Sequence, residues 1–155
     1  MRSHVSQIFF QAIPNPAGQK ANSGTGPSTV VKKTVMICED DRDLLRVYTL
    51  ALRSKYEIIG TASGRECISK YSENMRQGKK IDALLLDYSL GDMTGDKIAT
   101  KIREMNGTKI ILISAFEIEN DLVENLKTNG IITAFVKKPV TIGSLGVTLE
   151  NALRI

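Results

Sequence analysis

The chain has 155 residues, enough for one compact domain and too few for two comfortable ones. Its 42% hydrophobic and 25% charged residues are ordinary for a globular protein, and it has no run of 18 apolar residues that could cross a membrane. The two cysteines, Cys38 and Cys67, fit neither a disulfide framework nor a zinc site. A reducing cytoplasm is therefore the simplest location to expect.

The net charge of +4 comes from the start of the chain. Four of the 21 basic residues and none of the 17 acidic ones lie in residues 1–33, so residues 34–155 hold 17 of each. A groove for a phosphate backbone would need positive charge clustered on the folded part. We therefore expect neither nucleic acid nor a membrane as a direct partner.

Residues 1–33 are rich in Pro, Gly, Ser and Asn and hold three of the four prolines. This composition predicts a disordered or flexible N-terminal extension, followed by a single domain over residues 34–155. The short apolar stretch at residues 5–13 is the exception, and a docking peptide or a transit-like segment stays open for it.

From residue 34 onward, short apolar runs alternate with segments whose apolar residues recur at helical spacing. This alternation predicts an α/β fold of the flavodoxin-like, doubly wound (βα)5 type, with a five-stranded parallel sheet in the order 2-1-3-4-5. The strands are expected at residues 35–38, 57–60, 83–86, 110–113 and 132–136. Helices are expected between them, with end signals at Asn106-Gly107 and Asn129-Gly130.

Ligands of such sheets bind at the carboxyl ends of the strands, where the reactive side chains of this chain gather. Neighbouring carboxylates repel one another, and a hard divalent cation such as Mg²⁺ relieves that conflict. A lysine and a hydroxyl could then hold a phosphate, while one carboxylate acts as the nucleophile and forms an aspartyl phosphate. The residues concerned are Glu39, Asp40 and Asp41 after the first strand, Asp87 after the third, Ser114 after the fourth, and Lys137 and Lys138 after the fifth.

Four segments together resemble the signatures of response-regulator receiver domains of bacteria and archaea, and the resemblance covers about residues 33–155. They are Val35-Met36-Ile37-Cys38-Glu39-Asp40-Asp41, Leu84-Leu85-Leu86-Asp87, Ile111-Leu112-Ile113-Ser114-Ala115 and Phe135-Val136-Lys137-Lys138-Pro139. Each segment alone is weak, because apolar runs that end in Asp arise often by chance. Their order and spacing make the combination specific.

The resemblance implies a role for each matching position. Asp87 would accept the phosphoryl group, with Ser114 and Lys138 contacting it, and Ser114 and Phe135 would form the conformational switch. Glu39, Asp40 and Asp87 would bind Mg²⁺, together with the backbone carbonyl of Ser89, and Lys138–Pro139 would be a cis peptide bond. The alternatives are that Asp41 is a helix N-terminal acid, Ser114 a helix cap, Phe135 plain core and Lys137 a solvated surface charge.

The chain departs from the family pattern at two places. Leu90-Gly91 stands where members commonly have Met-Pro, and a glycine there loosens the loop. Gly95 does match the family's glycine at the start of the next helix. Phe116, two residues after Ser114, is bulky, and we hypothesise that it shields the site from water and slows dephosphorylation.

The resemblance implies a regulator that takes its phosphoryl group from a histidine kinase or phosphotransfer protein and passes its state to a downstream protein. It would not be a turnover enzyme, and a phosphorylation-dependent homodimer stays open. A haloacid-dehalogenase-type phosphatase is disfavoured because Ser89 stands where those enzymes need a second Asp, and no GxGxxG or P-loop pattern supports a nucleotide-binding domain. A phosphorylation-independent binding module is the remaining alternative. We expect a single-domain regulator, with a fragment of a longer one as the other reading.

Overall fold

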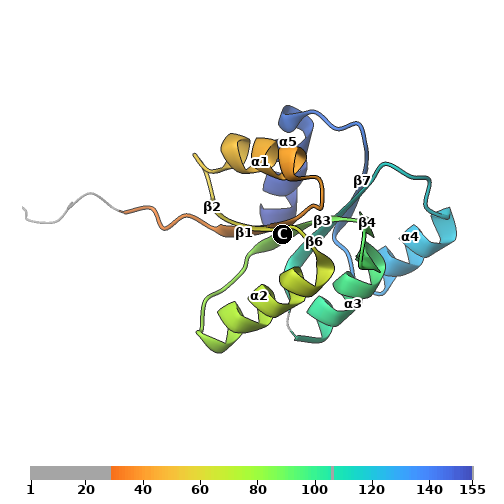
Figure 1. Ribbon diagram of the computed structural model, residues 1–155, viewed down its shortest axis with the longest axis horizontal. Coiled ribbons are helices and arrows are strands. Elements are labelled where there is room, and N and C mark those ends of the chain that lie inside the picture. Colours follow the sequence, from red (N-terminus) through yellow and green to blue (C-terminus); the bar gives the residue numbers. More distant parts are fainter. Residues whose placement is uncertain (1–28, 106, 155) are drawn as a thin grey trace, which may run out of the picture. The chain divides into compact units, whose positions relative to one another are not determined.

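The computed structural model describes residues 29–105 and 107–154 (Figure 1). The chain divides into two units, Met1–Val30 and Val31–Ile155, and all the described helices and strands belong to the second. Most of the extension predicted over residues 1–33, including the apolar stretch at 5–13, lies outside the described residues, so that prediction stays untested. Among the helices of the described part, none has the length and apolar character needed to cross a membrane.

Five parallel strands form the main sheet in the order β2-β1-β3-β6-β7. Counted along the chain without the two short strands β4 and β5, this is the predicted order 2-1-3-4-5. The sheet strands are β1 (Thr34–Cys38), β2 (Glu57–Thr61), β3 (Ala83–Asp87), β6 (Lys109–Ser114) and β7 (Ala134–Lys137). The helices are α1 (Arg42–Leu52), α2 (Gly64–Arg76), α3 (Gly95–Met105), α4 (Asn120–Thr128) and α5 (Ile142–Arg154).

Each face of the sheet is covered by its own set of helices. Helices α1 and α5 lie over one face, and α2, α3 and α4 over the other (Figure 1). Successive strand residues alternate between the two apolar clusters: Val35 and Ile37 join the α1/α5 side, whereas Met36 joins the α2/α3/α4 side. Because both faces are buried, the inner strands are apolar at nearly every position, and this made them readable in the sequence.

Local hydrogen bonds explain where the helices begin and end. The Asp41 carboxylate accepts from the backbone N–H groups of Asp43 and Leu44 at 3.0 and 3.1 Å, so Asp41 is the N-cap of α1, as the sequence suggested. Ser63 caps α2 by accepting from the Glu66 N–H at 3.1 Å. Helix α4 ends at Asn129 followed by Gly130, whose φ of 66° is the left-handed conformation that glycine adopts easily.

Two local features differ from the sequence prediction. Strand β7 begins at Ala134 rather than at Ile132, because the Ile132 N–H donates to the Leu126 carbonyl in the last turn of α4. A small hairpin follows β3 and was not predicted: β4 (Ser89–Leu90) pairs antiparallel with β5 (Met93–Thr94). Two-residue strands carry no readable periodicity, so the sequence could not reveal them.

Candidate functional site

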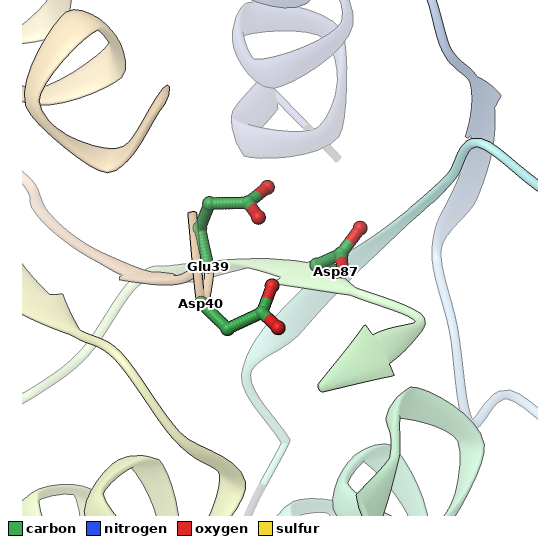
Figure 2. Close-up of side chains that lie close together, drawn as sticks. All are labelled: Glu39, Asp40 and Asp87. Atoms are coloured by element: carbon green, nitrogen blue, oxygen red, sulfur yellow. The ribbon is translucent and has the colours of Figure 1, made fainter. Parts of the chain in front are cut away.

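Three carboxylates meet at the carboxyl ends of β1 and β3. Glu39 and Asp40 follow β1 directly, Asp87 is the last residue of β3, and their side chains extend toward a common space (Figure 2). Each offers one oxygen, and these oxygens lie within 4.8 Å of one another. Glu39 and Asp87 are buried, whereas Asp40 is exposed. The cluster is therefore open to solvent on the Asp40 side.

A lysine from the far end of the sheet reaches into this cluster. Lys138, directly after β7, places its Nζ atom 2.8 Å from Glu39 Oε2 and 3.0 Å from Asp87 Oδ1. The Lys138 N–H also donates to the Ser114 carbonyl at 2.7 Å, and Lys138–Pro139 is a cis peptide bond, as the resemblance implied. Its neighbour Lys137 points elsewhere and pairs with Glu117 at 2.6 Å on the surface.

The site shifts the protonation equilibria of its own groups. Burial raises the pKa of Glu39 and of Asp87; the negative charge of Asp87 adds to the effect on Glu39, and that of Asp40 adds to the effect on Asp87. Burial by itself would lower the pKa of Lys138, but its hydrogen bonds to Glu39 and Asp87 outweigh burial, so its pKa is raised. One cation thus faces three acids, and the carboxylates repel one another.

The donor set fits the chemistry of a small hard cation. Three carboxylates and one ammonium leave an excess of negative charge, and Mg²⁺ takes one or two carboxylates together with water and phosphate oxygens. The backbone of Ser89, the fourth predicted ligand, is two residues after Asp87 at the start of β4, and its N–H lowers the pKa of the Asp87 carboxyl. Glu39, Asp40, Asp87 and the Ser89 carbonyl are the residues that would hold the ion.

Ser114 lies at the end of β6, next to both Asp87 and Lys138 along the sheet edge. Asp87 is in register with Ile113, and Ser114 with Lys137. The buried Ser114 hydroxyl accepts from the Phe116 N–H and donates to the Phe116 carbonyl, both at 3.0 Å. This hydroxyl is therefore engaged with its own loop, and its predicted role toward a phosphoryl group would require it to leave that loop.

Phe135 and Phe116 have different surroundings. Phe135, on the outer strand β7, is half-buried and packs against the apolar cluster on the α2/α3/α4 side of the sheet. Phe116 is 63% exposed in the loop that follows β6. Phe135 therefore has an edge position from which it could turn, and the Phe116 ring is free of the core.

Gly95 shows why a glycine is needed where α3 begins. A Cβ atom at this position would lie 2.8 Å from the Asp87 carbonyl oxygen and 2.9 Å from the Tyr88 Cα. The Gly95 N–H donates to the Tyr88 carbonyl at 2.7 Å. This close approach holds the start of α3 against the backbone of the Asp87 loop.

Two residues near the site were not predicted from the sequence. Asp92, at the turn of the β4–β5 hairpin, hydrogen-bonds to the start of α2 through both carboxylate oxygens. Tyr48 is buried on α1; burial raises the pKa of its phenol, the charge of Lys138 opposes this, and the charges of Glu39 and Asp87 add to it. Neither residue directly follows a strand of the five-stranded sheet, so a search of the residues after each strand could not find them.

The architecture matches solved receiver domains. A response regulator receiver domain protein (CheY-like) from Methanospirillum hungatei JF-1 superposes with a TM-score of 0.69 at 22% identity, covering 79% of this chain and 94% of that one. A receiver domain protein from Clostridium thermocellum gives a TM-score of 0.67 at 20% identity, with coverage of 79% and 94%. At these identities, the likeness establishes the fold alone.

Sequence comparison finds relatives among longer regulators. The nisin biosynthesis regulatory protein NisR of Lactococcus lactis is 27% identical over 121 residues, which is 77% of this chain and 50% of the relative. The transcriptional regulatory protein SrrA of Staphylococcus aureus is 29% identical over 121 residues, 77% of this chain and 47% of the relative. The chain thus spans about half the length of these curated relatives. The family model of the response regulator receiver domain matches residues 35–150, and the chain belongs to that family.

Proposed function

We propose that the domain is a phosphorylation-controlled switch of two-component signalling, in which Asp87 accepts a phosphoryl group from a histidine kinase or phosphotransfer protein. One observation carries this proposal: the Lys138 ammonium lies between the Glu39 and Asp87 carboxylates, with Asp40 beside them. Such a set neutralises and positions a phosphoryl group. The domain would work in the cytoplasm and would not turn over a separate substrate.

In the transfer step, an Asp87 carboxylate oxygen forms a new bond to phosphorus. The bond from phosphorus to the donor's histidine nitrogen breaks, and that nitrogen keeps the electron pair. Bound Mg²⁺ would neutralise phosphate oxygens and carboxylates together. Glu39, Asp40 and the Ser89 carbonyl would hold the ion, and Lys138 would exchange its contact with the Asp87 oxygen for one with a phosphoryl oxygen.

The phosphoryl group would then bias two states of the domain. It adds about −1.5 to −2 charge and three acceptor oxygens. The Ser114 hydroxyl, which is hydrogen-bonded to the Phe116 backbone in this structure, would turn toward the phosphoryl oxygens. Phe135 would then fill the space that Ser114 leaves. The face formed by α4, β7 and α5 would change shape and present a different surface to the downstream protein.

The proposal is tested by incubating the protein with acetyl phosphate and Mg²⁺ and measuring its intact mass. We expect wild type to gain the mass of one phosphoryl group, and Asp87→Asn to gain none because the nucleophilic oxygen is replaced by an amide. Asp40→Asn should label weakly, since it loses a carboxylate proposed to hold Mg²⁺. If wild type stays unlabelled while an established receiver domain labels in the same tube, the phosphorylation-independent binding module becomes the better reading.

A second experiment concerns the lifetime of the phosphorylated state. The exposed Phe116 ring stands in the loop that Ser114 contacts, where it could limit the access of water to phosphorylated Asp87. We expect Phe116→Ala to shorten the half-life of the phosphorylated protein, measured by the decay of the intact-mass peak after removal of the donor. Val147→Ala, which also removes an exposed apolar side chain but lies on α5, is the control and should leave the half-life unchanged. Equal half-lives in all three proteins would show that Phe116 does not shield the site.

A further inference from the structure

The hairpin beside Asp87 is fixed to a helix that belongs to another part of the fold. Its turn residue Asp92 accepts from the Gly64 N–H through Oδ1 and from the Arg65 N–H through Oδ2, both at 2.9 Å. These two groups are among the unsatisfied N–H groups at the start of α2, and a carboxylate is favoured there by the helix dipole. The same bonds hold the pKa of Asp92 below its usual value.

The start of α2 is in turn tied to the strand ends that supply Glu39 and Asp40. The Cys38 thiol donates to the Ser63 carbonyl at 3.5 Å. The Glu39 N–H donates to the Thr61 carbonyl at 3.1 Å, and the Thr61 hydroxyl donates to the Ile37 carbonyl. The end of β1, the end of β2 and the first turn of α2 thus form one hydrogen-bonded block.

Asp92 therefore links this block to the hairpin that contains Ser89. The sheet already holds Asp87 beside β1, and Leu90 is buried in the core, but Ser89 itself is exposed and the two-residue strand is followed by Gly91. Gly91 has no neighbour within 4 Å of where a Cβ would be, so it places little restraint on the turn. Close packing supports the same contact, since a Cβ on Gly64 would lie 2.5 Å from Met93 Cγ.

From this geometry we infer that Asp92 is a positioning residue for the metal site: it holds the hairpin so that the Ser89 carbonyl faces Glu39, Asp40 and Asp87. The inference rests on the proposed Mg²⁺-dependent function and adds a residue that touches neither the ion nor the phosphoryl group. Groups that orient metal ligands commonly change metal affinity by about 10- to 100-fold. Asp92 acts on one ligand of several, so its removal is expected to weaken Mg²⁺ binding by roughly 3- to 10-fold.

The test compares Asp92→Ala with Ser63→Ala in the full chain. Both variants remove a side-chain cap from the same helix, but only Asp92 is itself part of the hairpin. The half-saturating Mg²⁺ concentration is measured from amide chemical shifts in the absence of any phosphodonor. It should rise in Asp92→Ala, rise less in Asp92→Asn, and stay at the wild-type value in Ser63→Ala. In the metal-free protein, the amides of residues 89–91 should exchange faster in Asp92→Ala alone.

A rescue variant separates positioning from simple loss of stability. The backbone of Gly91 lies outside the left-handed region and its Cβ position is open, so Gly91→Ala fits and narrows the conformations of the turn. Added to Asp92→Ala, it should restore part of the Mg²⁺ affinity. If wild type binds Mg²⁺ and Asp92→Ala binds it equally well, the inference is wrong and the proposed function stands. If wild type binds no Mg²⁺ and takes no phosphoryl group, both are wrong.

Discussion

Replacing Lys138 by methionine is expected to destabilise the metal-free domain by about 2–3 kcal/mol at neutral pH, measured by urea unfolding in EDTA. Its ammonium is the cation within 3.0 Å of both Glu39 and Asp87, whose side chains are only 4% and 8% exposed. Removing one partner of a buried ionic group leaves the others uncompensated, typically at a cost of about 3–5 kcal/mol. The value here is set lower because the cluster opens to water beside Asp40.

The adjacent residue supplies a matched control. Lys137 has the same side chain, but its pair with Glu117 is 57% and 88% exposed, so Lys137→Met should leave stability close to that of wild type. Mg²⁺ should return part of the stability lost in Lys138→Met, because a divalent cation can replace the missing charge, and it should do so without restoring the lysine contacts. Equal unfolding midpoints for the two variants in EDTA would mean that Lys138 does not neutralise the buried acids.

Much of the fold was readable because its signals are local. Apolar runs buried on both faces marked the inner strands, and Asn129-Gly130 marked the end of α4. The start of β7 was misplaced because Ile132 is apolar and 3% exposed, like a strand residue, while its N–H is used to close α4. Hydrophobicity predicts that a residue is buried but not that it pairs in a strand, and Ile132 is buried without being part of the strand.

Part of the candidate site could also be predicted from the sequence. Because the ends of parallel strands share one edge, position in the sequence was enough to bring Glu39, Asp87 and Lys138 together. The direction of the Ser114 hydroxyl depends on the loop around Phe116, and sequence spacing does not determine it. The Asp92 contact joins residues 28 positions apart across a turn of no regular pattern, so only the folded chain reveals it.

The second large effect concerns pH. Burial raises the pKa of Asp87 and of Glu39 in the folded state, so each of these acids binds a proton more tightly there than in the unfolded chain. Their stabilising contribution is therefore complete at low pH and is lost as the pH rises through the folded-state pKa values. Lys138 does not enter this window, because its raised pKa gives a contribution that is lost only in the alkaline range. Acids with lowered pKa values, such as Asp92 and Glu66, act in the opposite direction, so the Asp87 component must be isolated with a variant.

Asp87→Asn is that variant. Because the net shift of Asp87 is upward in spite of Lys138, its ionised form is unfavourable in the fold, and removing the charge should stabilise the metal-free protein. The gain should be near zero in acid, where Asp87 is protonated in both the folded and the unfolded protein, and it should grow as the pH rises toward neutrality. Urea unfolding in EDTA across this range measures it. Glu104→Gln, which neutralises an exposed acid in the last turn of α3, is the control for the loss of one negative charge at the surface.

Mg²⁺ should reverse the order of stability, so that wild type becomes more stable than Asp87→Asn. At ten times its dissociation constant, the ion stabilises wild type by about 1.4 kcal/mol, whereas Asp87→Asn, with one ligand charge removed, should gain little. A wild-type curve that stays parallel to that of Asp87→Asn with and without Mg²⁺ would mean that the buried charge costs nothing and binds no ion. The predicted crossing follows from a single cause. The repulsion between carboxylates that destabilises the metal-free cluster is the same interaction that Mg²⁺ relieves. Replacing Asp87 therefore makes the domain more stable, but it also removes the charge that would hold Mg²⁺ and the oxygen that would take the phosphoryl group.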